Sequence, residues 1–224
     1  MKKLAPLILL SFLFQTELYS KGPDQLIKHL LDSLQQTEQV TQRIDLYHNI
    51  ADQYLLYYND LQTADSILQI AIKEAEATTD DEIIAYSYIN YLKIQIRGLY
   101  SEQALMINQK LKDLVNRLEN QDLKFDALSV ICKSCENLGQ ECGISYADKV
   151  LLQAVNSVDP KKLIEANLLK AKCFKNRNQW DLAYSYYAEA ELQILNLNEA
   201  DQKIEKRKLY RDLSEFFNLI NEYD

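Results

Sequence analysis

The sequence contains little glycine and little proline, with four and three copies in 224 residues. Turn-rich all-β proteins use both residues at many of their loops, so this scarcity argues against a sheet architecture. Leu, Gln, Lys, Glu and Ala are abundant instead, and 47% of the residues are hydrophobic, which is enough for a substantial core. The composition therefore predicts a chain that is nearly all helix.

Recognisable catalytic motifs are also missing. The two histidines, His29 and His48, do not stand near a serine or cysteine in a nucleophile motif. The sequence has no glycine-rich phosphate loop, no HExxH run and no paired-carboxylate signature. Acidic pairs such as Asp80 and Asp81 suit the start of a helix. We therefore expect neither an enzyme nor a bound cofactor.

The first twenty residues differ from the rest of the chain. Lys2 and Lys3 precede a mainly apolar run over residues 4–14. A transmembrane helix needs roughly 20 apolar residues, so this run is too short to span a bilayer and is typical of a secretory signal peptide. We expect a signal peptide over residues 1–20, cleaved after Ser20, and a protein that is exported to the periplasm or another extracytoplasmic space. The alternative is a buried first helix of a cytosolic protein.

The charge balance bears on the class of partner. Removal of Lys2, Lys3 and Glu17 from 25 basic and 33 acidic residues leaves 23 and 32, a net charge of −9. An acidic chain is repelled by phosphate backbones and by anionic lipid headgroups. We therefore expect the mature chain to bind no nucleic acid and to make no direct membrane contact.

The clearest pattern is a stripe of small and aromatic residues that follows a polar turn in residues 178–190. Its members, three or four positions apart, are Trp180, Ala183, Tyr187 and Ala190. This spacing places all of them on one face of a helix. Upstream, Ala171 and Phe174 form a complementary pair on a preceding helix. The pattern predicts two antiparallel helices that pack closely across their alanines.

Similar hairpins recur along the chain. The small residues near the start of the second helices are Ala64, Ala104, Ala147 and Ala183, which lie 40, 43 and 36 positions apart. This arrangement resembles the tetratricopeptide repeat (TPR) family, whose unit is two antiparallel helices with a period near 34 residues. The resemblance implies an all-α fold, a right-handed α-α superhelix of about four and a half helical hairpins. The longer period raises the alternative of another helical-hairpin solenoid.

We expect one repeat domain over residues 21–224. Its hairpins cover residues 41–78, 81–119, 122–157 and 160–197, and a half repeat covers residues 199–224. Gly98 marks the turn of the second hairpin. In the half repeat, Phe217 and the residues that follow it mirror Phe174 and its polar turn, so the sequence stops where a turn would begin. We therefore expect these residues to be the N-terminal part of a longer protein.

The sequence has four cysteines, Cys132, Cys135, Cys142 and Cys173. Cys132 and Cys135 fall inside a predicted helix, whereas zinc sites place such pairs on tight turns. Cys135 occupies the position that Ala51 and Ala171 take in sister hairpins, which favours a small buried thiol. Three interpretations stay open: buried thiols, one or two disulfides that export would permit, and a metal site.

The resemblance implies a concave binding surface built from the first helix of every hairpin. The best-known peptide binders of the family carry a clamp of Lys, Asn and Arg there. The matching positions in this chain hold other residues, His48, Asp52, Lys133 and Glu136. Our candidates for an acidic or carboxylate contact are Lys172, Lys175, Lys208 and Arg211, with Tyr54, Tyr88 and Tyr91 as aromatic candidates. Solvated lysines and tyrosines that pack between helices are the alternative.

The resemblance implies a non-catalytic protein-protein interaction module, an exported TPR solenoid that binds a protein or peptide segment. Exported arrays that resemble this one, in Bacteroidetes-like bacteria, often form the sensory part of longer signal transduction proteins. In such proteins a transmembrane helix and an output domain follow downstream. The alternative is a free periplasmic or surface assembly scaffold, and a small-ligand binder is a weaker one.

Overall fold

The computed structural model describes residues 22–96 and 101–223, with side chains as far as Ile220. The expected signal peptide and the turn expected at Gly98 lie outside these residues. Within the described ranges the chain forms helices and turns and contains no strand, which confirms the predicted all-α class. The chain divides into two compact units between Ile94 and Gln95. Each unit is described by itself.

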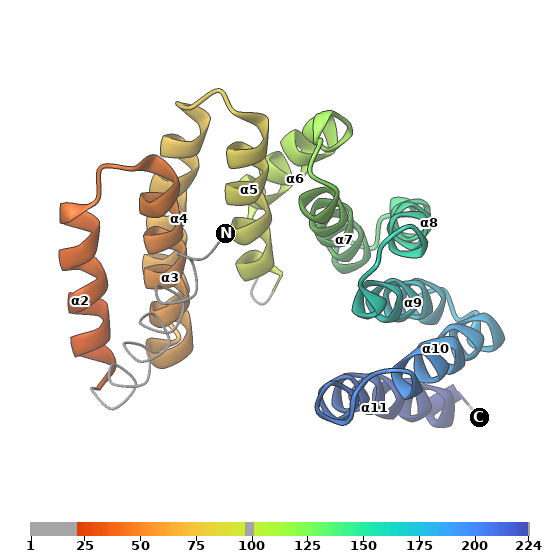
Figure 1. Ribbon diagram of the computed structural model, residues 1–224. Coiled ribbons are helices and arrows are strands. Elements are labelled where there is room, and N and C mark those ends of the chain that lie inside the picture. Colours follow the sequence, from red (N-terminus) through yellow and green to blue (C-terminus); the bar gives the residue numbers. More distant parts are fainter. Residues whose placement is uncertain (1–21, 97–100, 224) are drawn as a thin grey trace. The chain divides into compact units, whose positions relative to one another are not determined.

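The first unit is built from α2 (Pro23–Gln36), α3 (Val40–Tyr58), α4 (Leu61–Glu76) and α5 (Asp81–Gln95). α3 and α4 form an antiparallel hairpin, and α2 packs along α3 (Figure 1). The hairpin turn uses Asn59 in the left-handed conformation (φ 50°), which asparagine tolerates better than most residues. The side chain of Asp60 then caps α4 by accepting a hydrogen bond of 3.0 Å from the backbone N–H of Thr63.

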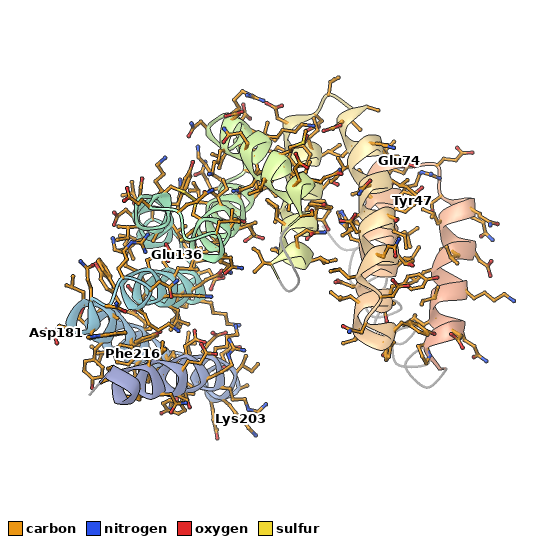
Figure 2. All side chains as sticks on the ribbon, turned by 180° about the vertical axis from the view of Figure 1, so that it is seen from behind. Tyr47, Glu74, Glu136, Asp181, Lys203 and Phe216 are labelled. Carbon is orange, nitrogen blue, oxygen red and sulfur yellow. A yellow bond between two sulfur atoms is a disulfide. The ribbon has the colours of Figure 1, made fainter. Side chains whose placement is uncertain are left out.

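A polar network joins α3 to α4 at the edge of the first core. The guanidinium of Arg43 donates to the carboxylate of Glu74 at 2.6 Å and to the hydroxyl of Tyr47 at 3.0 Å. The Tyr47 hydroxyl in turn donates to Glu74 at 3.0 Å, and Figure 2 shows the two side chains together. Below this network Tyr47 packs with Ile44 and Ala71, so the network closes one end of the core.

The second unit contains α6, a short 3₁₀ helix, and α7 to α11. Their bounds are α6 (Glu102–Leu114), η1 (Val115–Arg117), α7 (Gln121–Asn137), α8 (Cys142–Val155), α9 (Pro160–Lys175), α10 (Trp180–Leu195) and α11 (Glu199–Tyr223). Each α-helix from α6 onward packs against the next one along the chain, and α7 also contacts α9 (Figure 1). None of the helices in the described ranges has both the length and the apolar character needed to cross a bilayer.

Local sequence signals set the helix ends of the second unit. Gly139 (φ 63°) and Asn178 (φ 57°) take the left-handed conformation at the α7–α8 and α9–α10 turns. The side chain of Asn120 caps α7 by accepting from two backbone N–H groups. Asp159 caps α9 in the same way, and Pro160 at the first helical position brings a backbone angle that already suits a helix.

The alanines predicted to mark helix crossings are fully buried. Their positions are Ala64 on α4, Ala104 on α6, Ala147 on α8 and Ala183 on α10. A methyl side chain lets two helix backbones approach closely, and a larger side chain at these positions would push the helices apart. In the second unit Ala183 belongs to a core that also contains Tyr187 and Phe216, so α11 is packed on the hairpin of α9 and α10.

Candidate binding site

An open cavity of about 650 Å³ lies in the second unit. Its walls come mainly from α7, α9 and α11, the helices that the family resemblance assigns to the concave surface. Phe125, Leu168 and Leu169 contribute apolar surface, and Tyr187 reaches the cavity from α10. We call this cavity the α7–α9–α11 pocket.

Charged side chains of both signs line the α7–α9–α11 pocket. The basic ones are Lys133, Lys161, Lys162, Lys172, Lys175, Lys208 and Arg211. The acidic ones are Asp126, Asp159, Glu165, Glu205, Asp212 and Glu215. Seven positive and six negative groups nearly cancel, so the pocket carries mixed charges and only a small net positive charge.

Six of the seven basic residues of the pocket form an ion pair. The pairs with their N···O distances are Lys133–Glu165 (2.8 Å), Lys161–Asp201 (2.8 Å), Lys175–Glu215 (3.3 Å), Lys208–Glu205 (2.8 Å) and Arg211–Asp212 (3.3 Å), and Lys162 pairs with Asp122. Most of these pairs have an exposed member, so water weakens them and a partner can compete for the cation.

Lys172 differs from the other cations of the pocket. Its ammonium forms no ion pair and no side-chain hydrogen bond with any residue that the structure describes, and the side chain is half-buried. An ammonium group can donate three hydrogen bonds, and a half-buried one loses part of its hydration. Lys172 is therefore the basic group of the pocket with the most capacity left for an anionic partner.

The structure brings the four predicted basic residues together, because all of them line the α7–α9–α11 pocket. Their accessibility differs. Lys175 is 6% exposed and held by Glu215, whereas the side chains of Lys208 and Arg211 are 51% and 69% exposed. The half-buried Lys172 is thus intermediate in exposure between the buried Lys175 and the exposed Lys208 and Arg211.

The three predicted tyrosines belong to the first unit and do not line this pocket. Tyr91 is fully buried and its hydroxyl donates to the carboxylate of Asp65 at 2.9 Å. Tyr88 is buried as well and donates to Glu76, and burial together with this carboxylate raises the pKa of its phenol. Tyr88 and Tyr91 are therefore packing residues, and our expectation that they face a groove is corrected. Tyr54 is half-buried with its ring 5.8 Å from that of Tyr58.

The cysteines also divide into two kinds. Cys135 at the end of α7 and Cys142 at the start of α8 form a disulfide. Cys132 and Cys173 are buried free thiols. In the ranges that the structure describes, no three His, Cys, Asp or Glu side chains come close enough together to hold a metal ion.

Glu136 has a role that the sequence does not reveal. Its buried carboxylate accepts from the guanidinium of Arg177 at 3.0 Å and from the amide of Asn176 at 2.9 Å. Glu136, labelled in Figure 2, therefore ties α7 to the turn after α9, and it is not among the residues that line the pocket. The sequence offers one signal for this contact. Glu136 stands at a helical position where an apolar residue is expected, and Arg177, a basic residue that can pair with it, follows about one repeat later.

Neither a family model nor a curated protein matches the sequence. The structure is similar to the crystal structure of a signal transduction ATPase with numerous domains (STAND) from Pyrococcus horikoshii, a protein with a tetratricopeptide repeat sensor. The TM-score is 0.63 and the identity 18%, with 85% of this chain and 29% of that protein covered. At this identity the similarity shows the fold alone. It confirms the predicted all-α, TPR-like fold.

Proposed function

We propose that the chain is a non-catalytic protein-interaction module whose α7–α9–α11 pocket binds a peptide segment that carries carboxylate groups. The observation that supports this most directly is the half-buried ammonium of Lys172, which has no acidic partner among the described residues. A carboxylate placed beside it would gain a charge-assisted hydrogen bond. The exposed Lys208 and Arg211 would hold a second acidic group at the rim.

The shape and surface of the pocket favour a peptide over a small anion. A cavity of about 650 Å³ accommodates several residues, and its apolar lining, the half-buried Leu168 with the buried Phe125 and Leu169 beside it, offers contacts that an inorganic ion cannot use. Charges of both signs at fixed positions would set the register of the bound segment. Because packed helices form the walls, binding would avoid much of the ordering cost that a flexible surface incurs.

The experiment measures binding of fluorescent heptapeptides rich in Glu and Asp, each paired with its Gln and Asn counterpart, by fluorescence polarisation. We expect acidic peptides to bind and the Lys172→Glu variant to bind them about tenfold more weakly, which corresponds to about 1.4 kcal/mol. The matched control is Lys203→Glu on α11 (labelled in Figure 2), which makes the same charge change at an exposed position that does not line the pocket. Equal weakening by both variants would refute a site at Lys172.

We further propose that the protein is exported. The Cys135–Cys142 disulfide supports this, because disulfides persist in oxidising compartments and are rare in the cytosol. The signal-like residues 1–20 support it independently. Mass spectrometry of the protein from a bacterial periplasmic fraction should find a mature chain that begins at Lys21. An intact N-terminus in the cytosolic fraction would contradict export.

We also propose that the module is the sensory part of a longer signalling protein. The fold similarity to a STAND protein with a TPR sensor supports this, since the matched region is a minor part of that protein. The coding sequence after Asp224 tests the proposal. A membrane-spanning run followed by an output domain is the expected result. A few more hairpins and a stop codon would favour the free assembly scaffold instead.

A further inference from the structure

Two free thiols face each other inside the second unit. Cys132 on α7 and Cys173 on α9 are both fully buried, and their sulfur atoms are 3.7 Å apart. The Cys132 thiol also donates to the carbonyl of Gly143 at the start of α8, at 3.4 Å. One helical turn further along α7, Cys135 is already bonded to Cys142. All four cysteines therefore gather where α7, α8 and α9 meet.

We propose that Cys132 and Cys173 form a second disulfide in the mature protein, which covalently joins the α7–α8 hairpin to the α9–α10 hairpin. A disulfide has a sulfur–sulfur distance of about 2.05 Å, so the two sulfurs need to approach by less than 2 Å. The two side chains can share this movement. The crosslink does not depend on what the pocket binds.

The bond forms by thiol–disulfide exchange with a small-molecule disulfide such as oxidised glutathione. One cysteine attacks the glutathione disulfide as its thiolate, which releases one reduced glutathione and leaves a mixed disulfide. The other cysteine then displaces the second glutathione. Two protein thiols lose two electrons and two protons in total, and one glutathione disulfide is reduced to two thiols.

The burial of the pair decides when the exchange takes place. The hydrogen bond with Cys132 and the burial of the site both raise the pKa of the Cys173 thiol, so the reactive thiolate is scarce in the folded protein. The oxidant also has no open path to either sulfur. The second disulfide therefore forms while the chain folds, and reduced protein that has already folded reacts slowly.

The crosslink would lie directly behind the wall of the α7–α9–α11 pocket. Lys133 follows Cys132 on α7, and Lys172 precedes Cys173 on α9, and both lysines line the pocket. A bond between the two helices at this level fixes their spacing. The crosslink would therefore preserve the shape of the pocket wall, whereas without it the two hairpins could shift against each other.

Trypsin separates the relevant cysteines, which gives a direct assay. Cleavage after lysine places Cys132 in residues 125–133, Cys173 in residues 173–175, and both Cys135 and Cys142 in residues 134–149. The full chain is reduced in denaturant, refolded with oxidised and reduced glutathione, alkylated in denaturant so that buried thiols also react, and digested without reductant. We expect mass spectrometry to find residues 125–133 bonded to residues 173–175, with residues 134–149 bearing an internal disulfide.

Two comparisons complete the test. Protein that is folded in reductant and exposed to oxidised glutathione afterwards should yield the same bonded peptides many times more slowly. Oxidation during refolding should also raise the Tm of the second unit by roughly 5 °C or more beyond that of Cys173→Ser, which keeps the Cys135–Cys142 bond. If refolded, native-like protein carries alkyl groups on both Cys132 and Cys173, the second disulfide does not form and the proposal is overturned.

Discussion

The carboxylate of Glu136 on α7 occupies the space that a Cβ atom on Gly143 of α8 would need. The same carboxylate is held by Arg177 and Asn176 from the turn that follows α9. The missing side chain at position 143 therefore lets α8 pack directly against a buried acidic group that joins α7 to the turn after α9. The backbone conformation of Gly143 is one that other residues also adopt, so glycine is not needed for its φ angle. It is needed because the Glu136 carboxylate approaches the Cα atom closely.

The first prediction concerns this contact. The Gly143→Ala substitution forces the Glu136 carboxylate to move, which strains the packing and loosens its pairing with Arg177. We expect the free energy of unfolding to fall by about 1–3 kcal/mol, as measured by urea denaturation. In the Glu136→Ala background the same substitution should be neutral or stabilising by up to about 1 kcal/mol, because alanine favours the helix over glycine. An equal cost in both backgrounds would disprove the steric explanation.

The second prediction concerns the pH dependence of the first unit. His48 is buried beside Tyr86, and its Nδ1 lies 3.1 Å from the Asn90 amide nitrogen, which donates if Nδ1 is unprotonated. Burial, with a smaller contribution from Lys93, lowers the pKa of His48 to about 4. An unfolded histidine titrates near 6.5, so between these values the unfolded chain binds a proton that the folded chain does not. Stability is therefore full above pH 6.5 and falls by up to about 3 kcal/mol as the pH drops toward 4.

Two measurements check the behaviour of His48. In a His29→Gln variant, where His48 is the one histidine left, NMR should show the imidazole titrating near pH 4. Denaturation of the His48→Gln variant should show a smaller loss of stability between pH 7 and pH 5 than the original chain, because the variant has no proton to bind at this position. An imidazole that titrates between pH 6 and 7 in the folded protein would contradict the prediction.

The third prediction concerns the helix crossing in the second unit. Ala183 is fully buried between α9 and α10, so Ala183→Leu places three extra carbon atoms in a filled space. We expect a loss of about 1–3 kcal/mol in the free energy of unfolding. The neighbouring Leu182 is exposed, and Leu182→Ala should change stability by less than about 0.5 kcal/mol. Circular dichroism during urea denaturation measures both variants.

The fourth prediction separates packing from binding for the tyrosines. Tyr91→Phe removes the hydroxyl that donates to Asp65 and leaves the ring in place, so we expect a loss of about 1 kcal/mol in stability. Affinity for acidic peptides should not change, since Tyr91 does not line the pocket. Tyr57→Phe on the exposed surface of α3 is the matched control and should leave stability unchanged. A weaker affinity in Tyr91→Phe alone would restore Tyr91 as a binding residue.

Features that depend on residues close in the sequence could be predicted well. The spacing of Trp180, Ala183 and Tyr187 indicates a buried helical stripe because helix geometry alone places these residues on one face. Asp60 and Asp159 identify helix starts because a capping side chain bonds within its own turn. Such signals were enough to predict the all-α class and the hairpin construction.

Features that depend on distant partners could not be predicted. The pocket cations were found from their spacing, but the pairing of Lys175 with Glu215, forty residues away, depends on how α9 and α11 pack. Likewise, the three-residue spacing of Tyr88 and Tyr91 places them on one helix face without saying whether that face meets the core or a groove. The choice of Cys142 as the partner of Cys135 depends on a turn that reverses the chain at Gly139.

Trp180, the single tryptophan of the chain, lies at the base of α10 with its ring centroid 6.0 Å from that of Phe216 on α11. Its fluorescence therefore responds to the local event in which α11 separates from the hairpin before it. Far-ultraviolet circular dichroism sums the helices of both units. When both signals are recorded in one thermal scan, a change in fluorescence at a lower temperature than the loss of circular dichroism identifies separation of the last helix before the whole chain melts.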